Sequence, residues 1–132
     1  MAKKKSVADS TLTSLWSKAV RARDKRCPIT GATEELQSHH IINKGRQRRF
    51  ALRWDIRNGL ALSHWAHREL HDGNLEINER IVDYVRQRGD LEYLEERRHL
   101  FKHDLLLELG MSENEYRKYI KKELQKYVKK LD

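Results

Sequence analysis

The chain has 132 residues, of which 38% are hydrophobic and 36% charged, and its formal net charge is +8. This length suits one domain with a modest core, and the single cysteine excludes both an intramolecular disulfide and a metal site built only from thiolates. No apolar run approaches the roughly 20 residues that cross a bilayer, so we expect a cytoplasmic protein without a membrane partner.

The excess positive charge lies entirely in residues 1–89, because residues 90–132 contain equal numbers of acidic and basic side chains. A basic surface favours a polyanionic partner, and nucleic acid is the commonest one. The alternative is a basic surface that only keeps the protein in solution. The asymmetry of the charge favours a nucleic-acid site in the first part of the chain.

The predicted elements begin with a helix that follows a basic tail. Residues 1–8 contain lysines and small side chains without apolar spacing, so we expect disorder there. From Asp9, apolar residues recur with helical spacing, namely Leu12, Leu15, Trp16, Ala19 and Val20. Pro28 and Gly31 then interrupt the chain.

Short extended segments are predicted in the middle of the chain. Residues 34–42 contain apolar, β-favouring anchors, and residues 50–54 alternate between large apolar and other side chains, so we expect a strand in each. Asn58-Gly59 signals a turn before the apolar residues 60–62. Ser63 is a suitable N-cap for a helix that carries His64, His67 and His71.

Three further helices are predicted, over residues 77–88, 90–109 and 112–131, the last one opened by a capping box at Ser112 and Glu115. The predicted fold class is therefore α+β and mostly helical. Two short antiparallel strands and a helix form its core, flanked by N-terminal and C-terminal helices. We expect a basic tail (1–8), a core with its lead-in helix (9–75) and a helical extension packed on the core (76–132), all in a single domain.

Five of the seven histidines lie between His39 and His71. His67 and His71 are four residues apart, which places both imidazoles on one face of a helix, as in a chelate for a divalent metal. The doublet His39-His40 offers a further ligand and, beside it, a general base. The sequence therefore predicts a metal site with an adjacent base.

Three segments together, residues 38–42, 54–62 and 67–71, resemble the HNH endonuclease family of phage type, whose core is a ββα-metal fold. The resemblance implies that His40 activates water and that Asn58 bonds a backbone or orients the base. It also implies that His39, His67 and His71 hold one divalent ion. For His64, a contact to phosphate or to a ligand and a solvated helix start both remain open.

The identity of the ion follows less directly from the resemblance. Many members carry aspartate where His39 stands, which favours Mg²⁺ or Mn²⁺, whereas an all-histidine set, as in the colicin-type nucleases, leaves Zn²⁺, Ni²⁺ and Co²⁺ open. Many relatives also hold a structural zinc with two cysteine pairs. Here those positions are Cys27, Thr30, Ser63 and Ala66, so this zinc site is absent.

The expected partner is double-stranded DNA. We expect its phosphates to be bound by basic residues around the core, namely Lys44, Arg46, Arg48, Arg49, Arg53, Arg57 and Arg68. Phosphate contacts carry no base sequence, so we expect low sequence specificity. An alternative for Arg53 and Arg57 is an ion pair with Asp55 or Glu69.

Together these features predict a metal-dependent endonuclease that hydrolyses DNA phosphodiester bonds by nicking or double-strand cleavage. One site cuts one strand, so a double-strand break needs a homodimer or two visits by a monomer, and both states remain open. The alternative is a non-catalytic DNA-binding or assembly module that retains the HNH scaffold. This alternative does not explain why the chain keeps His40, Asn58 and the three histidine ligands, which a module without catalysis would be free to lose.

Overall fold

The structure is a computed structural model that describes residues 6–42 and 50–129. Within these ranges the elements are α1 (Asp9–Asp24), β1 (Gln37–His40), α2 (Phe50–Arg53), the 3₁₀ helix η2 (Ile56–Asn58), β2 (Gly59–Leu62), α3 (His64–His71), α4 (Leu75–Arg88), α5 (Leu91–Arg97), α6 (Lys102–Leu109) and α7 (Glu113–Lys129). The mostly helical α+β class is thus confirmed. None of the described helices is long and apolar enough to span a membrane.

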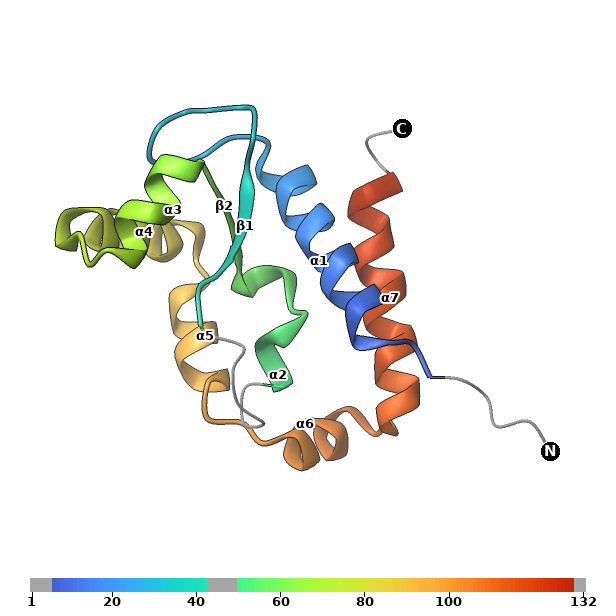
Figure 1. Cartoon of the computed structure of the whole chain (residues 1–132). Helices are drawn as coiled ribbons and strands as arrows, with labels where there is room; N and C mark the ends of the chain where they lie inside the picture. Colours follow the sequence, from blue (N-terminus) through green and yellow to red (C-terminus); the bar gives the residue numbers. More distant parts are fainter. Residues whose placement is uncertain (1–5, 43–49, 130–132) are drawn as a thin grey trace.

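The two strands pair antiparallel and lie between α1 on one side and α3 on the other (Figure 1). His39 is opposite Leu60, and His40 is opposite Gly59. Because side chains alternate along a strand, Gln37 and His39 face α3, whereas Ser38 and His40 face α1. The histidine doublet is therefore divided between the two faces of the sheet.

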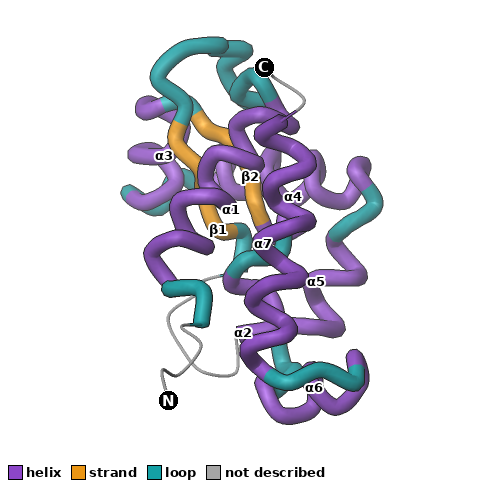
Figure 2. Tube along the Cα trace, turned by 90° about the vertical axis from the view of Figure 1, so that its right-hand side faces the viewer, coloured by secondary structure: helices purple, strands orange, loops and turns teal. Residues whose placement is uncertain are grey.

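Each face of the sheet borders its own hydrophobic core. The core on the α1 side includes Leu12, Trp16, Val20, Trp54, Ala61, Tyr116 and Leu124. The core on the α3 side includes Leu60, Leu62, Ala66, Ile77, Ile81, Val85 and Leu94. Figure 2 shows α7 running beside α1, so the C-terminal helix packs on the first core.

Gly59 allows α1 to pack closely on β2. A Cβ atom at this position would lie 2.2 Å from Val20 Cγ2 and 3.0 Å from Trp16 Cζ2. The predicted Asn58-Gly59 turn is wrong, because Asn58 ends η2 and Gly59 begins β2 with an extended φ of −119°. This glycine is needed for space, since its backbone conformation suits any residue.

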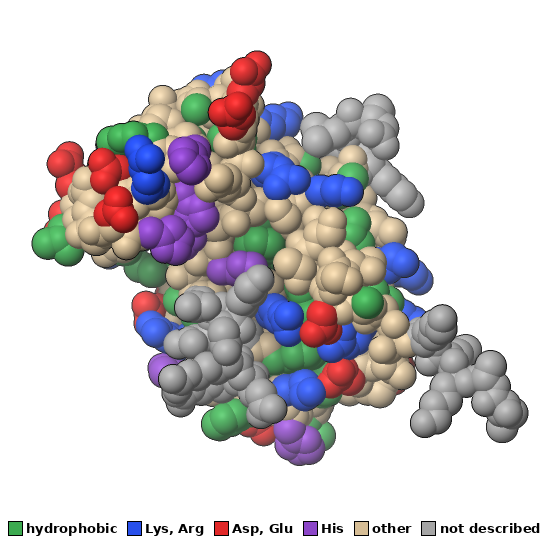
Figure 3. Space-filling model, viewed as in Figure 1, with side chains coloured by type: hydrophobic (Ala, Val, Ile, Leu, Met, Phe, Trp, Pro, Cys, Tyr) green, Lys and Arg blue, Asp and Glu red, His purple; other side chains and the backbone are tan. Residues whose placement is uncertain are grey.

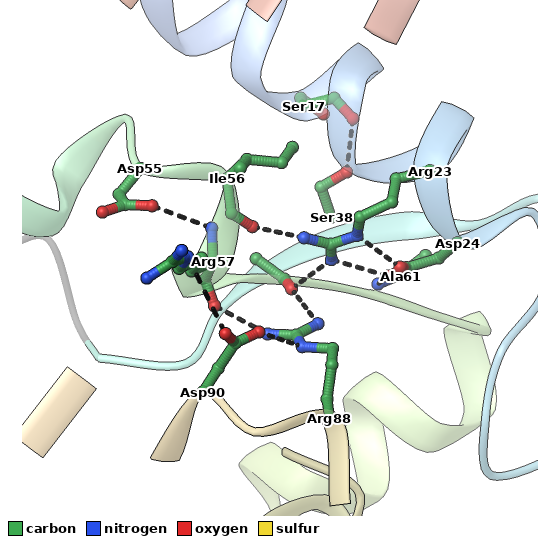
Figure 4. A network of polar contacts seen from close by, with 11 residues as sticks. Ser17, Arg23, Asp24, Ser38, Asp55, Ile56, Arg57, Ala61, Arg88 and Asp90 are labelled. Carbon is green, nitrogen blue, oxygen red and sulfur yellow. Dashed lines mark hydrogen bonds and ion pairs between the residues drawn. The ribbon is translucent and has the colours of Figure 1, made fainter. Parts of the chain in front are cut away.

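Arginines from α1 and α4 hold the start of β2 (Figure 4). The Arg23 guanidinium donates to the Gly59 carbonyl at 2.6 Å, and the Arg88 guanidinium donates to the same oxygen at 3.0 Å. Asp24 accepts a hydrogen bond from the Ala61 amide at 2.8 Å. These contacts fix η2 and β2 against the ends of two helices.

Two predicted elements differ from the structure. Residues 50–54 form the helical turn α2 rather than a strand, since Phe50, Ala51 and Leu52 are all buried and Phe50 contacts Trp54 four residues later. A segment this short fits both periodicities.

The predicted helix over residues 90–109 is interrupted between α5 and α6. Phe101, inside the predicted helix, has an extended backbone and is 57% exposed. The break lets Leu94 enter the core on the α3 side and Leu105 the core on the α1 side. By contrast, the capping box is confirmed, because Ser112 and Glu115 exchange hydrogen bonds through their side chains and amides.

Candidate metal centre and adjacent base

Three imidazoles, those of His39, His67 and His71, converge between β1 and α3. Their ligand nitrogens all lie within 4.8 Å of one another. His67 Nε2 and His71 Nε2 are 3.1 Å apart, and the His39 ring centroid is 5.2 Å from that of His67. The three ligands predicted for one ion therefore come together in space.

This donor set fits a divalent ion. Two nitrogens bound at about 2.0–2.1 Å in a tetrahedral site lie roughly 3.3 Å apart, close to the separation of the His67 and His71 nitrogens. Three imidazoles leave a fourth position for water or substrate, as catalytic centres require. Imidazole nitrogens suit Zn²⁺, Ni²⁺ and Co²⁺, whereas Mg²⁺ and Mn²⁺ prefer oxygen ligands.

The helix α3 presents its two histidines because its other face is anchored. Ser63 Oγ accepts a hydrogen bond from the Ala66 amide at 3.2 Å, which confirms the predicted N-cap. Ala66 is fully buried and Leu70 is half-buried against the second core. The i, i+4 spacing then directs His67 and His71 together towards β1.

The neighbouring imidazoles also keep each other neutral. Burial, followed by the proximity of His67 and His71, lowers the pKa of His39 to about 4. Burial, followed by the proximity of His71, lowers the pKa of His67 as well. Neutral imidazole is the form that binds a metal, so these two ligands need lose no proton at neutral pH.

His40 lies on the other face of β1, against α1. Its ring stacks on Trp16 with centroids 3.7 Å apart and planes inclined by 9°. His40 Nε2 lies 2.9 Å from the carbonyl oxygen of Arg53. Because a carbonyl only accepts, Nε2 carries the hydrogen, and the lone pair of the neutral ring is on Nδ1.

Asn58 is fully buried and bonds the backbone two residues after β1 and within α2. Its Nδ2 donates to the carbonyls of Ile42 (2.9 Å) and Leu52 (3.1 Å), and its Oδ1 accepts from the Ile42 amide at 2.7 Å. These are the backbone contacts that the resemblance implied. Asn58 therefore holds the backbone at Ile42 and at Leu52 together, and its side chain has no exposed surface.

The predicted DNA-binding residues divide into three groups. Lys44, Arg46, Arg48 and Arg49 lie outside the described residues. The guanidinium groups of Arg53 and Arg57 pair with Asp9 (3.3 Å) and Asp90 (3.9 Å), so the alternative partners Asp55 and Glu69 were wrong.

Arg68 forms the third group. It is exposed on α3 one turn before His71, and no carboxylate pairs with it among the residues that the structure describes. On the face drawn in Figure 3, histidine side chains gather near α3, and Lys and Arg side chains lie beside them.

Sequence reasoning missed two neighbours of the histidines. Trp16 was assigned only to the core, although it also stacks on His40. Gln37 bonds His67 and His64 through its side-chain amide, which connects His64 to the metal ligands. The available signal was the i, i+2 spacing of Gln37 and His39, which puts both on one face of a strand.

The arrangement can hold one cation beside an oriented imidazole base, a combination suited to the hydrolysis of a phosphate ester. The lone cysteine, Cys27, is buried, and Ser63 serves as a helix cap. No protein-family model, curated protein or solved structure matches this chain.

Proposed function

We propose that this protein is a metal-dependent endonuclease of the HNH type that hydrolyses phosphodiester bonds of DNA. The observation that carries the proposal is the division of the doublet on β1. His39 joins His67 and His71 at a donor set that fits one ion, while His40, the next residue, is held as an oriented base. Within the described residues β1 pairs only with β2, so its other edge has no strand beside it. A DNA backbone along that edge would meet His39 on one face of the strand and His40 on the other.

The proton transfer in this proposal belongs to His40. Nδ1 of the neutral ring takes a proton from the attacking water, while Nε2–H keeps donating to the Arg53 carbonyl. The Trp16 ring fixes the imidazole plane and stabilises the resulting imidazolium through a cation–π interaction. Asn58 keeps the end of β1 in place through the Ile42 backbone.

The three imidazoles would hold a divalent ion, and such an ion would supply positive charge for the scissile phosphate and the leaving oxygen. On this donor set Zn²⁺, Ni²⁺ and Co²⁺ are the first ions to test, followed by Mn²⁺ and Mg²⁺, which the family resemblance favours. Arg68, on the same helix as two ligands, supplies a phosphate contact without reading a base, which agrees with low sequence specificity.

The test is cleavage of supercoiled plasmid by the full chain with each metal, with EDTA as the metal-free control. We expect nicked or linear product from the wild type, none with EDTA, and a rate about 10²–10⁴-fold lower for His40→Ala. His99→Ala is the matched control, because His99 is an exposed histidine on a different segment, and it should cut like the wild type.

Equal cleavage by the wild type and His40→Ala would refute the proposed base. A wild type that binds DNA but cuts it with none of the five metals would instead identify a non-catalytic DNA-binding module.

A further inference from the structure

We propose that Gln37 is a positioning residue of the metal centre, which fixes His67 in the tautomer that presents Nε2 to the ion. Gln37 Oε1 lies 2.6 Å from His67 Nδ1, and Gln37 Nε2 lies 3.3 Å from His64 Nδ1. The inference rests on the proposed function in assuming an ion at the three histidines. Its account of His67 also holds for the metal-free protein.

The direction of the first hydrogen bond determines the tautomer. An amide oxygen only accepts, so His67 Nδ1 must carry the hydrogen and its Nε2 must carry the lone pair. Nε2 is the nitrogen that lies 3.1 Å from His71 Nε2, within the metal donor set. Without the acceptor, the hydrogen of His67 can occupy either nitrogen. In the tautomer with the hydrogen on Nε2, this nitrogen cannot bind the ion.

The second hydrogen bond determines the orientation of the Gln37 amide. Its Nε2–H donates to His64 Nδ1, which directs the amide oxygen towards His67. His64 therefore contributes to the centre without being a ligand. In the structure the side chain of His64 thus contacts Gln37, a residue beside the three proposed ligands.

The position of Gln37 in the fold allows its effect on the metal centre to be measured without a large change in stability. Gln37 is the first residue of β1, is exposed, and pairs with Leu62 through the backbone. Its side chain leaves the cores untouched, so substitution should preserve the fold. Gln37 and His39 share the face towards α3, where the amide also ties β1 to the helix that carries the other two ligands.

The first measurement is calorimetric titration of the full chain with Zn²⁺ and with Mn²⁺. Gln37→Leu removes the acceptor and should weaken metal affinity about 10–100-fold. Gln37→Glu keeps an acceptor for His67 Nδ1–H and should bind within threefold of the wild type or more tightly. His64→Ala removes only the second hydrogen bond and should weaken affinity less than Gln37→Leu does.

The second measurement reads the tautomer in metal-free protein from the ¹⁵N shifts of the histidine rings. We expect His67 to be the Nδ1–H form in the wild type and in Gln37→Glu, and a mixture or the Nε2–H form in Gln37→Leu. A general loss of structure would alter all rings, whereas this prediction concerns His67 and, through the amide, His64.

The outcomes separate the two proposals. If the wild type binds no metal yet His67 is held as Nδ1–H by Gln37, the metal centre fails and the role of Gln37 in setting the tautomer stands. If metal binds and Gln37→Leu keeps the wild-type affinity and tautomer, the inference about Gln37 is overturned and the metal centre stands.

Discussion

The two faces of β1 are built in different ways. On the α1 side, Ser38 and His40 bond backbone carbonyls and His40 stacks on a buried Trp16, so the main chain and the core hold these side chains. On the α3 side, Gln37 and His39 meet other polar side chains that are partly exposed to solvent. The main chain and the core thus orient the proposed base, whereas polar side chains at the surface hold the proposed metal donors.

This difference predicts that damage to the α1 side lowers stability, whereas damage to the α3 side lowers metal affinity. The largest loss of stability is expected for Asn58→Ala. It removes three hydrogen bonds from a fully buried side chain and leaves the Ile42 amide and carbonyl without their Asn58 partners, which should lower the free energy of unfolding by about 3 kcal/mol. Urea denaturation measures this change, and a loss below about 1 kcal/mol would contradict the role assigned to the amide.

A second substitution tests the close packing of α1 on the sheet. Gly59→Ala should destabilise the protein by about 2 kcal/mol, because the added methyl group meets Val20 Cγ2. Combining it with Val20→Ala removes the clashing atom, so the double variant should be more stable than the sum of the two single losses predicts. If the two losses simply add in the same denaturation experiment, the contact between the added methyl group and Val20 is not the cause of the destabilisation.

The α3 side should respond to pH in the metal-free protein. The pKa of His39 is lowered to about 4 in the folded state by burial and by His67 and His71, whereas an unfolded histidine titrates near 6.5. The unfolded state therefore binds more protons between these values, and the free energy of unfolding should fall as pH is lowered through this window. Allowing for solvent screening, the loss should be about 2 kcal/mol.

Denaturation with EDTA at pH 7 and at pH 4.5, compared with His39→Leu, isolates this contribution. The variant lacks the titrating group and should lose less stability on acidification than the wild type. Parallel losses in the two proteins would exclude His39 as the source.

The smallest effect is expected on the outer surface of α3. Arg68→Ala removes a cation beside the metal ligands, so DNA affinity should fall by about twofold to tenfold, equally for unrelated sequences. The slope of affinity against salt concentration should also become shallower by about one ion. Fluorescence anisotropy at several salt concentrations measures both, and an unchanged slope would remove Arg68 from the DNA contact surface.

Much of this architecture could be predicted from local patterns. The apolar stripe of α1, the Ser63 cap and the capping box at Ser112 are short-range signals, and the i, i+4 spacing brought His67 and His71 together. The convergence of His39 with them needed the motif order as well, because the two segments are far apart in the sequence.

The rest depends on tertiary packing. Nothing in residues 98–101 signals the break between α5 and α6, since the segment contains neither glycine nor proline and its apolar spacing continues. Its cause is the separation of the two cores, which no single segment encodes. Gln37 and Trp16 were missed for a similar reason, because their contacts to the histidines exist only once β1 lies between two helices.

The most direct test of the account compares two adjacent residues on opposite faces of β1. Zn²⁺ and Mn²⁺ titrations of His39→Ala and His40→Ala, together with plasmid cleavage by each, measure ligand and base separately. We predict that His39→Ala loses both metal affinity and cleavage, while His40→Ala binds metal like the wild type and cuts about 10²–10⁴-fold more slowly. Equal loss of metal binding in both variants, or wild-type binding by His39→Ala, would contradict the division of roles across the strand.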